Sequence, residues 1–292
     1  MTPHPASPPI IWETLSRDAL DLQLSPSNFA KDIQEVLHRH EEITVTLKDD
    51  RNLHVCRDIT YGAAAQERFD LVTPQGQGPF PCLVFIHGGF WMEGSRTGSG
   101  FAAQTLALNG WANALIGYSL APGATLAEIV AEISAALEYL ADHAIELNID
   151  PDYIVIAGHS AGAYLAAAMI TGLGSQKAAQ VAAGALLISG VYDIAPLTGS
   201  YIGEVVDFGP PPWITLSPIY HQPLRDIPIH ILVGADEPDH FMRHSRMLHE
   251  YWGPARDGME LHVAPCRDHF DVLDELSDAG SASFKALMAM AG

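Results

Sequence analysis

Apolar and polar positions along this chain separate buried strands from amphipathic helices. Short, almost wholly apolar runs are typical of strands buried on both faces of a sheet, and the stretches between them place apolar residues on one helical face. The predicted buried strands are residues 82–86, 111–118, 153–156, 185–188, 229–233 and 260–263. Their alternation with helices predicts an α/β protein with a mostly parallel, doubly wound sheet, whose ligands bind at the carboxyl ends of the strands.

The N-terminal part of the chain has a different pattern. Residues 29–38 carry apolar residues at helical spacing after Ser25-Pro26-Ser27, which predicts an amphipathic helix. The stretches that alternate like strands are 43–47, 52–59 and 67–73. We therefore expect an antiparallel edge on the sheet. Residues 1–57 should act as an N-terminal cap or edge segment of a single domain that spans residues 1–292.

A long stretch without regular periodicity, residues 189–221, lies between two predicted buried strands and contains three consecutive prolines from Pro210. A segment of this length without its own secondary structure usually covers a site. We expect this cap-like insertion, around residues 190–222, to form a small cap together with the N-terminal segment.

Composition and charge narrow the choice of partners. With 48% apolar residues among 292, the chain can bury a sizeable core. The formal net charge of −20 disfavours nucleic acid and anionic membranes through electrostatic repulsion, and no apolar run is long enough to span a bilayer. The N-terminal residues lack the basic start and apolar core of a signal peptide. We expect a cytoplasmic monomer or homodimer that acts on a small molecule.

Neither the cysteines nor the histidines form a metal-binding pattern. The three cysteines, Cys56, Cys82 and Cys266, are widely spaced and contain no C-x-x-C. His240 and His244 stand one helical turn apart, but no glutamate follows the first histidine, so the zincin pattern fails. We expect two stacked surface histidines there, and we expect no metal and no cofactor.

A serine flanked by glycines lies where a buried strand meets a helix-forming stretch. Gly158 and Gly162 surround Ser160 in G-x-S-x-G spacing, which lets the chain turn sharply and lifts the serine hydroxyl above the sheet edge. Because the helix begins at once, the Ala161 N–H and the positive end of the helix dipole lie beside any oxyanion formed there. The pattern predicts Ser160 as the nucleophile of an acyl-transfer reaction rather than part of a chance turn.

A second glycine motif follows the apolar run 82–86. Gly88 and Gly89 come just past the end of this predicted strand, and serine hydrolases need backbone N–H donors at such a place, opposite the nucleophile. The bulky residues that follow should admit only a small acyl group and present flat faces to an aromatic ring. The expected substrate-binding residues are Phe90, Trp91, His159 and Tyr192, with loop residues 193–221 completing the pocket.

Two further side chains complete a catalytic triad. His269 follows the last predicted strand, and the chain order serine, acid, histidine is that of α/β-hydrolases. A serine nucleophile needs a base within hydrogen-bond reach, and the base needs a carboxylate that fixes its tautomer. Asp236 and Glu237 leave the same strand end with opposite side-chain directions, so we expect one of them to face His269. The residues by themselves leave both acids open.

Several short segments resemble the serine-type kynurenine formamidases, and the resemblance extends nearly from end to end. They are His87-Gly-Gly-Phe-Trp, Tyr118-Ser-Leu-Ala-Pro, Gly158-His-Ser-Ala-Gly, Ser189-Gly-Val-Tyr-Asp, Glu237-Pro-Asp-His-Phe and His269-Phe-Asp-Val-Leu. The resemblance implies an α/β-hydrolase fold with Ser160 as nucleophile and His269 as base. The implied oxyanion donors are Gly88, Gly89 and Ala161.

The resemblance also bears on the acid. In that family the acid stands four residues before the phenylalanine that Phe241 matches, which implies Glu237. This chain thus has glutamate where the animal enzymes have aspartate. Asp236 is the acid only if the local register shifts.

The same resemblance implies hydrolysis of an aryl formamide such as N-formylkynurenine. Relatives on this scaffold also cleave esters, other amides and carbamates. The first alternative is a carboxylesterase, because the His-Gly-Gly stretch and the elbow serine also resemble hormone-sensitive-lipase-like esterases. A non-catalytic binding protein is disfavoured because every triad element is present in order. A metal hydrolase built on His240 and His244 is disfavoured by the missing glutamate.

Overall fold

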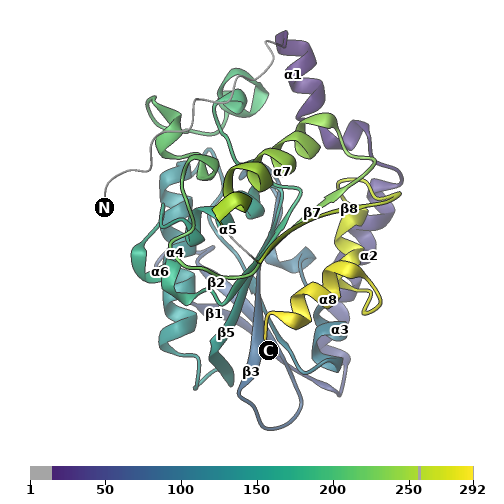
Figure 1. The fold of residues 1–292 in the computed structure, drawn as a ribbon. Coiled ribbons are helices and arrows are strands. Elements are labelled where there is room, and N and C mark those ends of the chain that lie inside the picture. Colours follow the sequence, from purple (N-terminus) through teal and green to yellow (C-terminus); the bar gives the residue numbers. More distant parts are fainter. Residues whose placement is uncertain (1–14, 256–257, 292) are drawn as a thin grey trace.

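The computed structural model describes residues 15–255 and 258–291, so residues 1–14 of the expected N-terminal cap lie outside the described residues. The described residues form one eight-stranded sheet in the order β1-β2-β4-β3-β5-β6-β7-β8 (Figure 1). The strands are β1 Leu53–Thr60, β2 Arg68–Pro74, β3 Phe80–Ile86, β4 Ala112–Ile116, β5 Ile149–His159, β6 Gly184–Ile188, β7 Ile229–Gly234 and β8 Met259–Ala264. The pairs β1–β2 and β2–β4 are antiparallel and the other neighbouring pairs are parallel. The predicted fold is confirmed.

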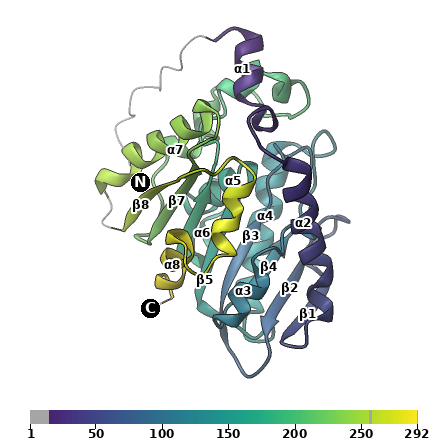
Figure 2. The same cartoon turned by 90° about the vertical axis from the view of Figure 1, so that its right-hand side faces the viewer.

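Helices cover both faces of this sheet (Figures 1 and 2). They are α1 Arg17–Gln23, α2 Ile33–Thr46, α3 Ala103–Leu108, α4 Leu126–Asp142, α5 Ala161–Ile170, α6 Gln176–Val181, α7 Asp239–Trp252 and α8 Ala282–Ala289. Helices α4 to α7 share one core with Val84 and Ile86 of β3, whereas Leu83 and Phe85 enter the other core with α3 and α8. Side chains alternate across a strand, so β3 contributes to both cores.

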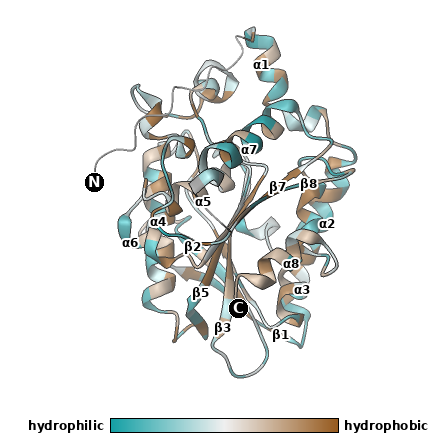
Figure 3. Ribbon diagram, in the orientation of Figure 1, coloured by the Kyte–Doolittle hydropathy of each residue, from teal (hydrophilic) through white to brown (hydrophobic). Residues whose placement is uncertain are grey.

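The hydropathy of the strands and helices agrees with their positions in the fold. Figure 3 shows the central strands as hydrophobic, while the helices around them also carry hydrophilic residues. This is the pattern expected when a parallel sheet is buried on both faces. None of the described helices combines the length and apolar character that crossing a bilayer would require.

One prediction about the N-terminal segment is wrong, and another is confirmed with shifted bounds. Residues 43–47, predicted as a strand, belong to α2 and to the 3-10 turn Leu47–Asp49 that follows it. The helix predicted for 29–38 begins at Ile33, after Asp32 at φ 52°. The buried residues of α2 are Val36, His40 and Thr44. This four-residue spacing shows that tertiary packing overrides the strand preference of the β-branched residues near the helix end.

The insertion 189–221 forms no α-helix or strand, as predicted, but contains short 3-10 helices. These are Pro196–Gly199, Tyr201–Glu204, Trp213–Thr215 and Pro218–Tyr220. It packs against the N-terminal segment, because the Tyr201 N–H donates to Asp21 Oδ1 at 2.9 Å and the Tyr201 hydroxyl donates to the Leu24 carbonyl at 2.9 Å. Figure 1 places both segments at the top of the molecule.

The turn between β5 and α5 depends on a close approach of backbone to backbone. Ser160, at the turn, has φ 55° and ψ −117°, a conformation that costs a non-glycine residue on the order of 1–3 kcal/mol. A Cβ atom on Gly158 would collide with the carbonyl group of Gly162, and one on Gly162 would collide with the carbonyl group of Ile86. These backbone atoms cannot move without shifting a strand or a helix, so only glycine fits at both positions.

Replacing Gly162 by alanine should therefore destabilise the fold. We expect Gly162→Ala to lower the free energy of unfolding by about 3 kcal/mol, because a collision with backbone cannot be relieved by a rotamer change. Urea denaturation followed by circular dichroism measures the loss. Gly98→Ala is the matched control, since a Cβ there meets nothing within 4 Å. Equal stabilities of the two variants would contradict the close-approach argument.

Candidate active site

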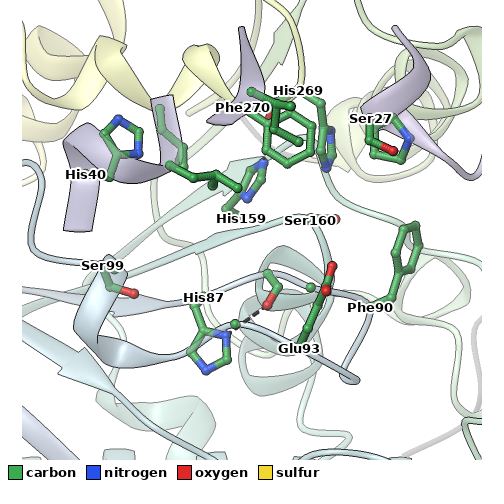
Figure 4. Close-up of a pocket in the computed structure, with 18 of the residues that line it drawn as sticks. Ser27, His40, His87, Phe90, Glu93, Ser99, His159, Ser160, His269 and Phe270 are labelled. Atoms are coloured by element: carbon green, nitrogen blue, oxygen red, sulfur yellow. Dashed lines mark hydrogen bonds between the residues drawn. The ribbon is translucent and has the colours of Figure 1, made fainter. Parts of the chain in front are cut away.

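Ser160 lines a cavity at the carboxyl end of β5 (Figure 4). The residue is buried, and its N–H donates to the Ile188 carbonyl at 2.8 Å, which ties the turn to β6. Ala161 is the first residue of α5. The N–H groups of a first helical turn have no acceptor within the helix. The Ala161 N–H can therefore face a negatively charged oxygen beside Ser160, with the helix dipole adding to the attraction.

The loop after β3 lies against this turn. A Cβ atom on Gly88 would be 2.9 Å from the His159 carbonyl oxygen and 3.0 Å from Ser160 Cβ, so the absence of a side chain permits the contact. In the described part of the chain, the N–H groups of Gly88 and Gly89 donate to no protein acceptor. Both glycines line the cavity beside Ser160. The arrangement brings the sequence-predicted donors and nucleophile to one place.

Three successive residues of the same loop take left-handed conformations. Gly89, Phe90 and Trp91 have φ values of 105°, 47° and 60°. This tight turn is closed by hydrogen bonds from the N–H groups of Met92 and Glu93 to the Gly89 carbonyl, at 2.9 and 3.0 Å. Positive φ is uncommon for bulky residues, and such strain often marks a functional site.

The carboxylate of Glu237 orients His269. Its Oε2 accepts the His269 Nδ1–H at 2.7 Å, while Oε1 accepts the Gly234 N–H at 2.6 Å and the Ser189 hydroxyl. Both side chains are buried. With Nδ1 protonated toward Glu237, Nε2 of a neutral His269 is the acceptor nitrogen.

Asp236, the other acid considered, points elsewhere. Its carboxylate pairs with the Lys31 ammonium at 2.7 Å, and its side chain is 39% exposed. Successive residues after β7 thus point in different directions. The structure brings Glu237, and not Asp236, to His269.

Two more histidines in the cavity wall are neutral near pH 7. Burial lowers the pKa of His87 to about 4 and holds the pKa of His159 well below its usual range. The His159 Nε2–H donates to the His269 carbonyl at 2.8 Å. The His87 Nδ1–H donates to the Gly88 carbonyl at 2.8 Å, and the ring stacks on Tyr118 at 4.2 Å. The two rings thus donate hydrogen bonds to backbone carbonyls in two loops of the cavity wall, the loop after β3 and the loop after β8.

The cavity has a volume of about 380 Å³, a size that suits a small molecule. Its walls come from the N-terminal segment, β3 and the loop after it, the loop after β5, Tyr201 of the insertion, and the segment after β8. The residues that the N-terminal segment contributes are Ser25, Pro26, Ser27, Ile33, Leu37 and His40. The amphipathic pattern of residues 29–38 indicated a buried face but carried no signal for which surface that face covers.

Trp91, expected to contact the substrate, does not line this cavity. Its ring is fully buried in T-shaped contacts with Tyr164 and Phe208, at centroid distances of 5.2 and 5.8 Å. Phe90 and His159 do line the cavity, as expected. The left-handed turn explains the difference, because it directs successive side chains to different sides of the loop.

Tyr192 is also absent from the cavity lining. The residue is fully buried, and its N–H donates to His244 Nδ1 at 3.0 Å. Among the described residues of the insertion 189–221, Tyr201 is the one that lines the cavity. The expectation that residues 193–221 complete the pocket therefore holds only for Tyr201. The N-terminal segment forms the part of the wall that the insertion was expected to form.

His240 and His244 are buried and not on the surface, so the expectation of two surface histidines is wrong. Their Nε2 atoms are 3.1 Å apart, and burial lowers the pKa of His240 to about 4 and the pKa of His244 well below 6.5. Both lie on the face of α7 that packs against the core. Within the described residues, no group of three or more side chains could hold a metal ion.

Comparison with known sequences gives relatives over nearly the whole length. A kynurenine formamidase of Danio rerio is 26% identical over 292 residues, which cover 96% of this chain and 98% of the relative. A family model described as BD-FAE matches residues 69–198. This range includes all of β2 except its first residue, and β3 to β6 with both the loop after β3 and the Ser160 turn.

Solved structures agree with the fold. A candidate thioesterase from Silicibacter sp. TM1040 has a TM-score of 0.80 and 26% identity, over 93% of this chain and 98% of that chain. An esterase from Pyrobaculum calidifontis has a TM-score of 0.68 at 19% identity, over 92% and 97% of the two chains. The second likeness concerns the fold alone.

The buried histidines predict how stability depends on pH. Those whose pKa is lowered by burial are His87, His159, His230, His240 and His244. In the unfolded chain they take up protons near pH 6.5, and in the folded chain only near pH 4 or below. The unfolded state therefore binds more protons between these values, so stability is full above about pH 6.5 and falls as the pH drops toward 4.

We expect the free energy of unfolding to be lower at pH 5 than at pH 7.5, with His230, whose pKa is lowered to about 4, contributing about 1–2 kcal/mol of the difference. Urea denaturation at the two values measures the difference. His230→Asn should reduce it, whereas His38→Asn should not, because the His38 side chain is 70% exposed. A wild-type protein equally stable at both pH values would refute this prediction.

Proposed function

We propose that this chain, a member of the kynurenine formamidase family of α/β-hydrolases, hydrolyses a small aryl formamide through an acyl-enzyme. Ser160 is the nucleophile, His269 the base and Glu237 the acid of this proposal. The observation that carries it is that His269, which lines the same cavity as Ser160, forms a 2.7 Å hydrogen bond with the buried Glu237 carboxylate.

The proposed reaction begins with attack of Ser160 Oγ on the formyl carbon. His269 Nε2 takes the hydroxyl proton, and the Glu237 carboxylate stabilises the resulting imidazolium. The N–H groups of Gly88, Gly89 and Ala161 hold the negative oxygen of the tetrahedral intermediate. The imidazolium then protonates the departing arylamine nitrogen as the C–N bond breaks. Water, deprotonated by the same histidine, then attacks the formyl ester of Ser160. Formate leaves, and the proton returns from the histidine to Ser160 Oγ.

The cavity lining favours an aromatic substrate. Its aromatic residues are Phe85, Phe90, Phe101, Tyr201 and Phe270. The Phe90 ring lies 6.4 Å from the Tyr201 ring and 6.3 Å from the Phe241 ring, so it is held in place next to the oxyanion glycines. A flat ring can pack against such a wall, and the limited volume favours formyl over larger acyl groups.

Ester hydrolysis is the second candidate function. The structural relative at 26% identity is described as a candidate thioesterase, and the same nucleophile and oxyanion donors cleave esters. The two reactions differ in the leaving group. An arylamine needs the proton from His269, whereas an alkoxide or thiolate needs it less.

A substrate series tests the proposal. We expect kcat/KM to be highest for a formanilide and to fall by about 10-fold for each methylene added to the acyl group, because packed side chains must move. Ser160→Ala should lower turnover by about 10³-fold or more while the fold persists. A fluorophosphonate should label the wild type and not this variant. Higher turnover of acetyl or butyryl esters than of formanilides would favour the esterase instead.

The acid can be identified by comparing two conservative changes. Glu237→Gln should lower kcat by about 10³- to 10⁴-fold, since an amide cannot accept all three hydrogen bonds or stabilise the imidazolium. Asp236→Asn, which removes only the Lys31 pair, should change kcat by less than about twofold. Equal losses in the two variants, or a larger loss in Asp236→Asn, would remove Glu237 from the triad.

A further inference from the structure

The lining of the cavity beside Ser160 contains few acidic or basic side chains. Among its described lining residues, Glu93 is the single carboxylate and there is no lysine or arginine. Two of the lining histidines, His87 and His159, are neutral because burial lowers their pKa. A negatively charged group on a substrate would therefore find no lysine or arginine side chain in this wall.

Lysine and arginine residues that lie close to the lining residues in the sequence pair with carboxylates outside the lining. Arg96, next to Ser95, contacts Asp70 at 3.0 Å. Lys31 binds Asp236 at 2.7 Å, and Arg39 binds Asp274 at 2.7 Å. Arg267 lies 3.6 Å from the same Asp274. The positive charges of these side chains are therefore offset by carboxylates that do not line the cavity.

His40, at another part of the wall, contacts a carboxylate that lies outside the lining. It is 3% exposed, and its Nε2 lies 2.9 Å from Asp274 Oδ1. The Asp274 carboxylate accepts the hydrogen bond from this Nε2–H. Figure 4 places His40 and Glu93 at different sides of the cavity.

Glu93 is held by its backbone and keeps a free carboxylate. Its N–H donates to the Gly89 carbonyl at 3.0 Å, while no described lysine, arginine or histidine forms an ion pair with its side chain. Figure 4 shows the carboxylate between Ser160 and Phe90. Burial and, to a smaller extent, the charges of Asp21 and Glu93 raise the pKa of Tyr201, which lines the same cavity as Glu93.

We infer that Glu93 is a specificity-determining residue that makes this enzyme prefer neutral or cationic aryl substrates and disfavour those that carry a carboxylate. The inference rests on the proposed function and deepens it by stating the charge of the substrate. A substrate ammonium beside Glu93 gains a charge-assisted hydrogen bond, and a carboxylate there is repelled. Since the protein carries a net charge of −20, long-range repulsion acts in the same direction.

The test uses ortho-acyl formanilides that are identical except for the end of the acyl chain, which is an ammonium, a methyl or a carboxylate group. The same three end groups on phenyl acetates form a parallel ester series. kcat/KM is measured for the wild type, Glu93→Gln and Glu146→Gln. Glu146 is the matched control, because it is exposed in the connection that leads into the start of β5, away from the strand ends that hold Ser160.

We expect the wild-type ratio of ammonium to carboxylate substrate to be on the order of 100-fold, about tenfold for each end group relative to methyl. Glu93→Gln should reduce this ratio by about tenfold, and Glu146→Gln should leave it unchanged. Ratios within one variant cancel differences in folded enzyme.

A wild type that prefers the carboxylate substrate or does not discriminate would overturn the inference, as would a ratio that Glu93→Gln leaves unchanged. Failure of the proposed function has a different signature. If only the ester series turned over, formamide hydrolysis would be refuted, while the charge ratio within the esters would still decide the role of Glu93.

Discussion

The arrangement of the site depends on a backbone contact that only glycine permits. Helix α5 lies so close to β5 and β3 that neither Gly158 nor Gly162 has room for a Cβ atom. This contact holds Ser160 at positive φ and starts α5 at the next residue. The serine hydroxyl and the first N–H groups of the helix are therefore presented together. Because α5 is buried along its whole length, the surrounding core can sustain the strain at the turn.

Around this turn, a carboxylate is hydrogen-bonded to the proposed base, while two other histidines of the cavity wall are neutral. The Glu237 carboxylate accepts three hydrogen bonds, from β7, from the residue after β6 and from His269. Burial keeps His87 and His159 neutral. In surroundings of low dielectric constant, the electrostatic interaction between one oriented carboxylate and the neighbouring imidazole is strong. The other histidines position backbone and do not compete for the proton.

The cavity wall is assembled from distant parts of the chain. Helix α2 is tied to the segment after β8, because His40 and Arg39 both contact Asp274. The insertion meets the N-terminal segment through Tyr201. Much of the cavity wall therefore comes from segments outside the sheet. The proposed triad residues lie in the loops that follow the carboxyl ends of strands. Such a division lets substrate preference vary without disturbing the catalytic groups.

The sequence by itself determined the buried strands, the mostly parallel sheet and the turn at Ser160, because burial on both faces and the glycine spacing are local properties of the chain. Only the tertiary structure decided the rest. The direction in which Trp91 points follows from a left-handed turn, and the burial of His240 and His244 follows from the face of α7 that meets the core. Likewise, residues 43–47 are helical because α2 packs through Val36, His40 and Thr44. Local periodicity indicates which residues are buried, but the surface against which each one packs is set by contacts between segments far apart in the chain.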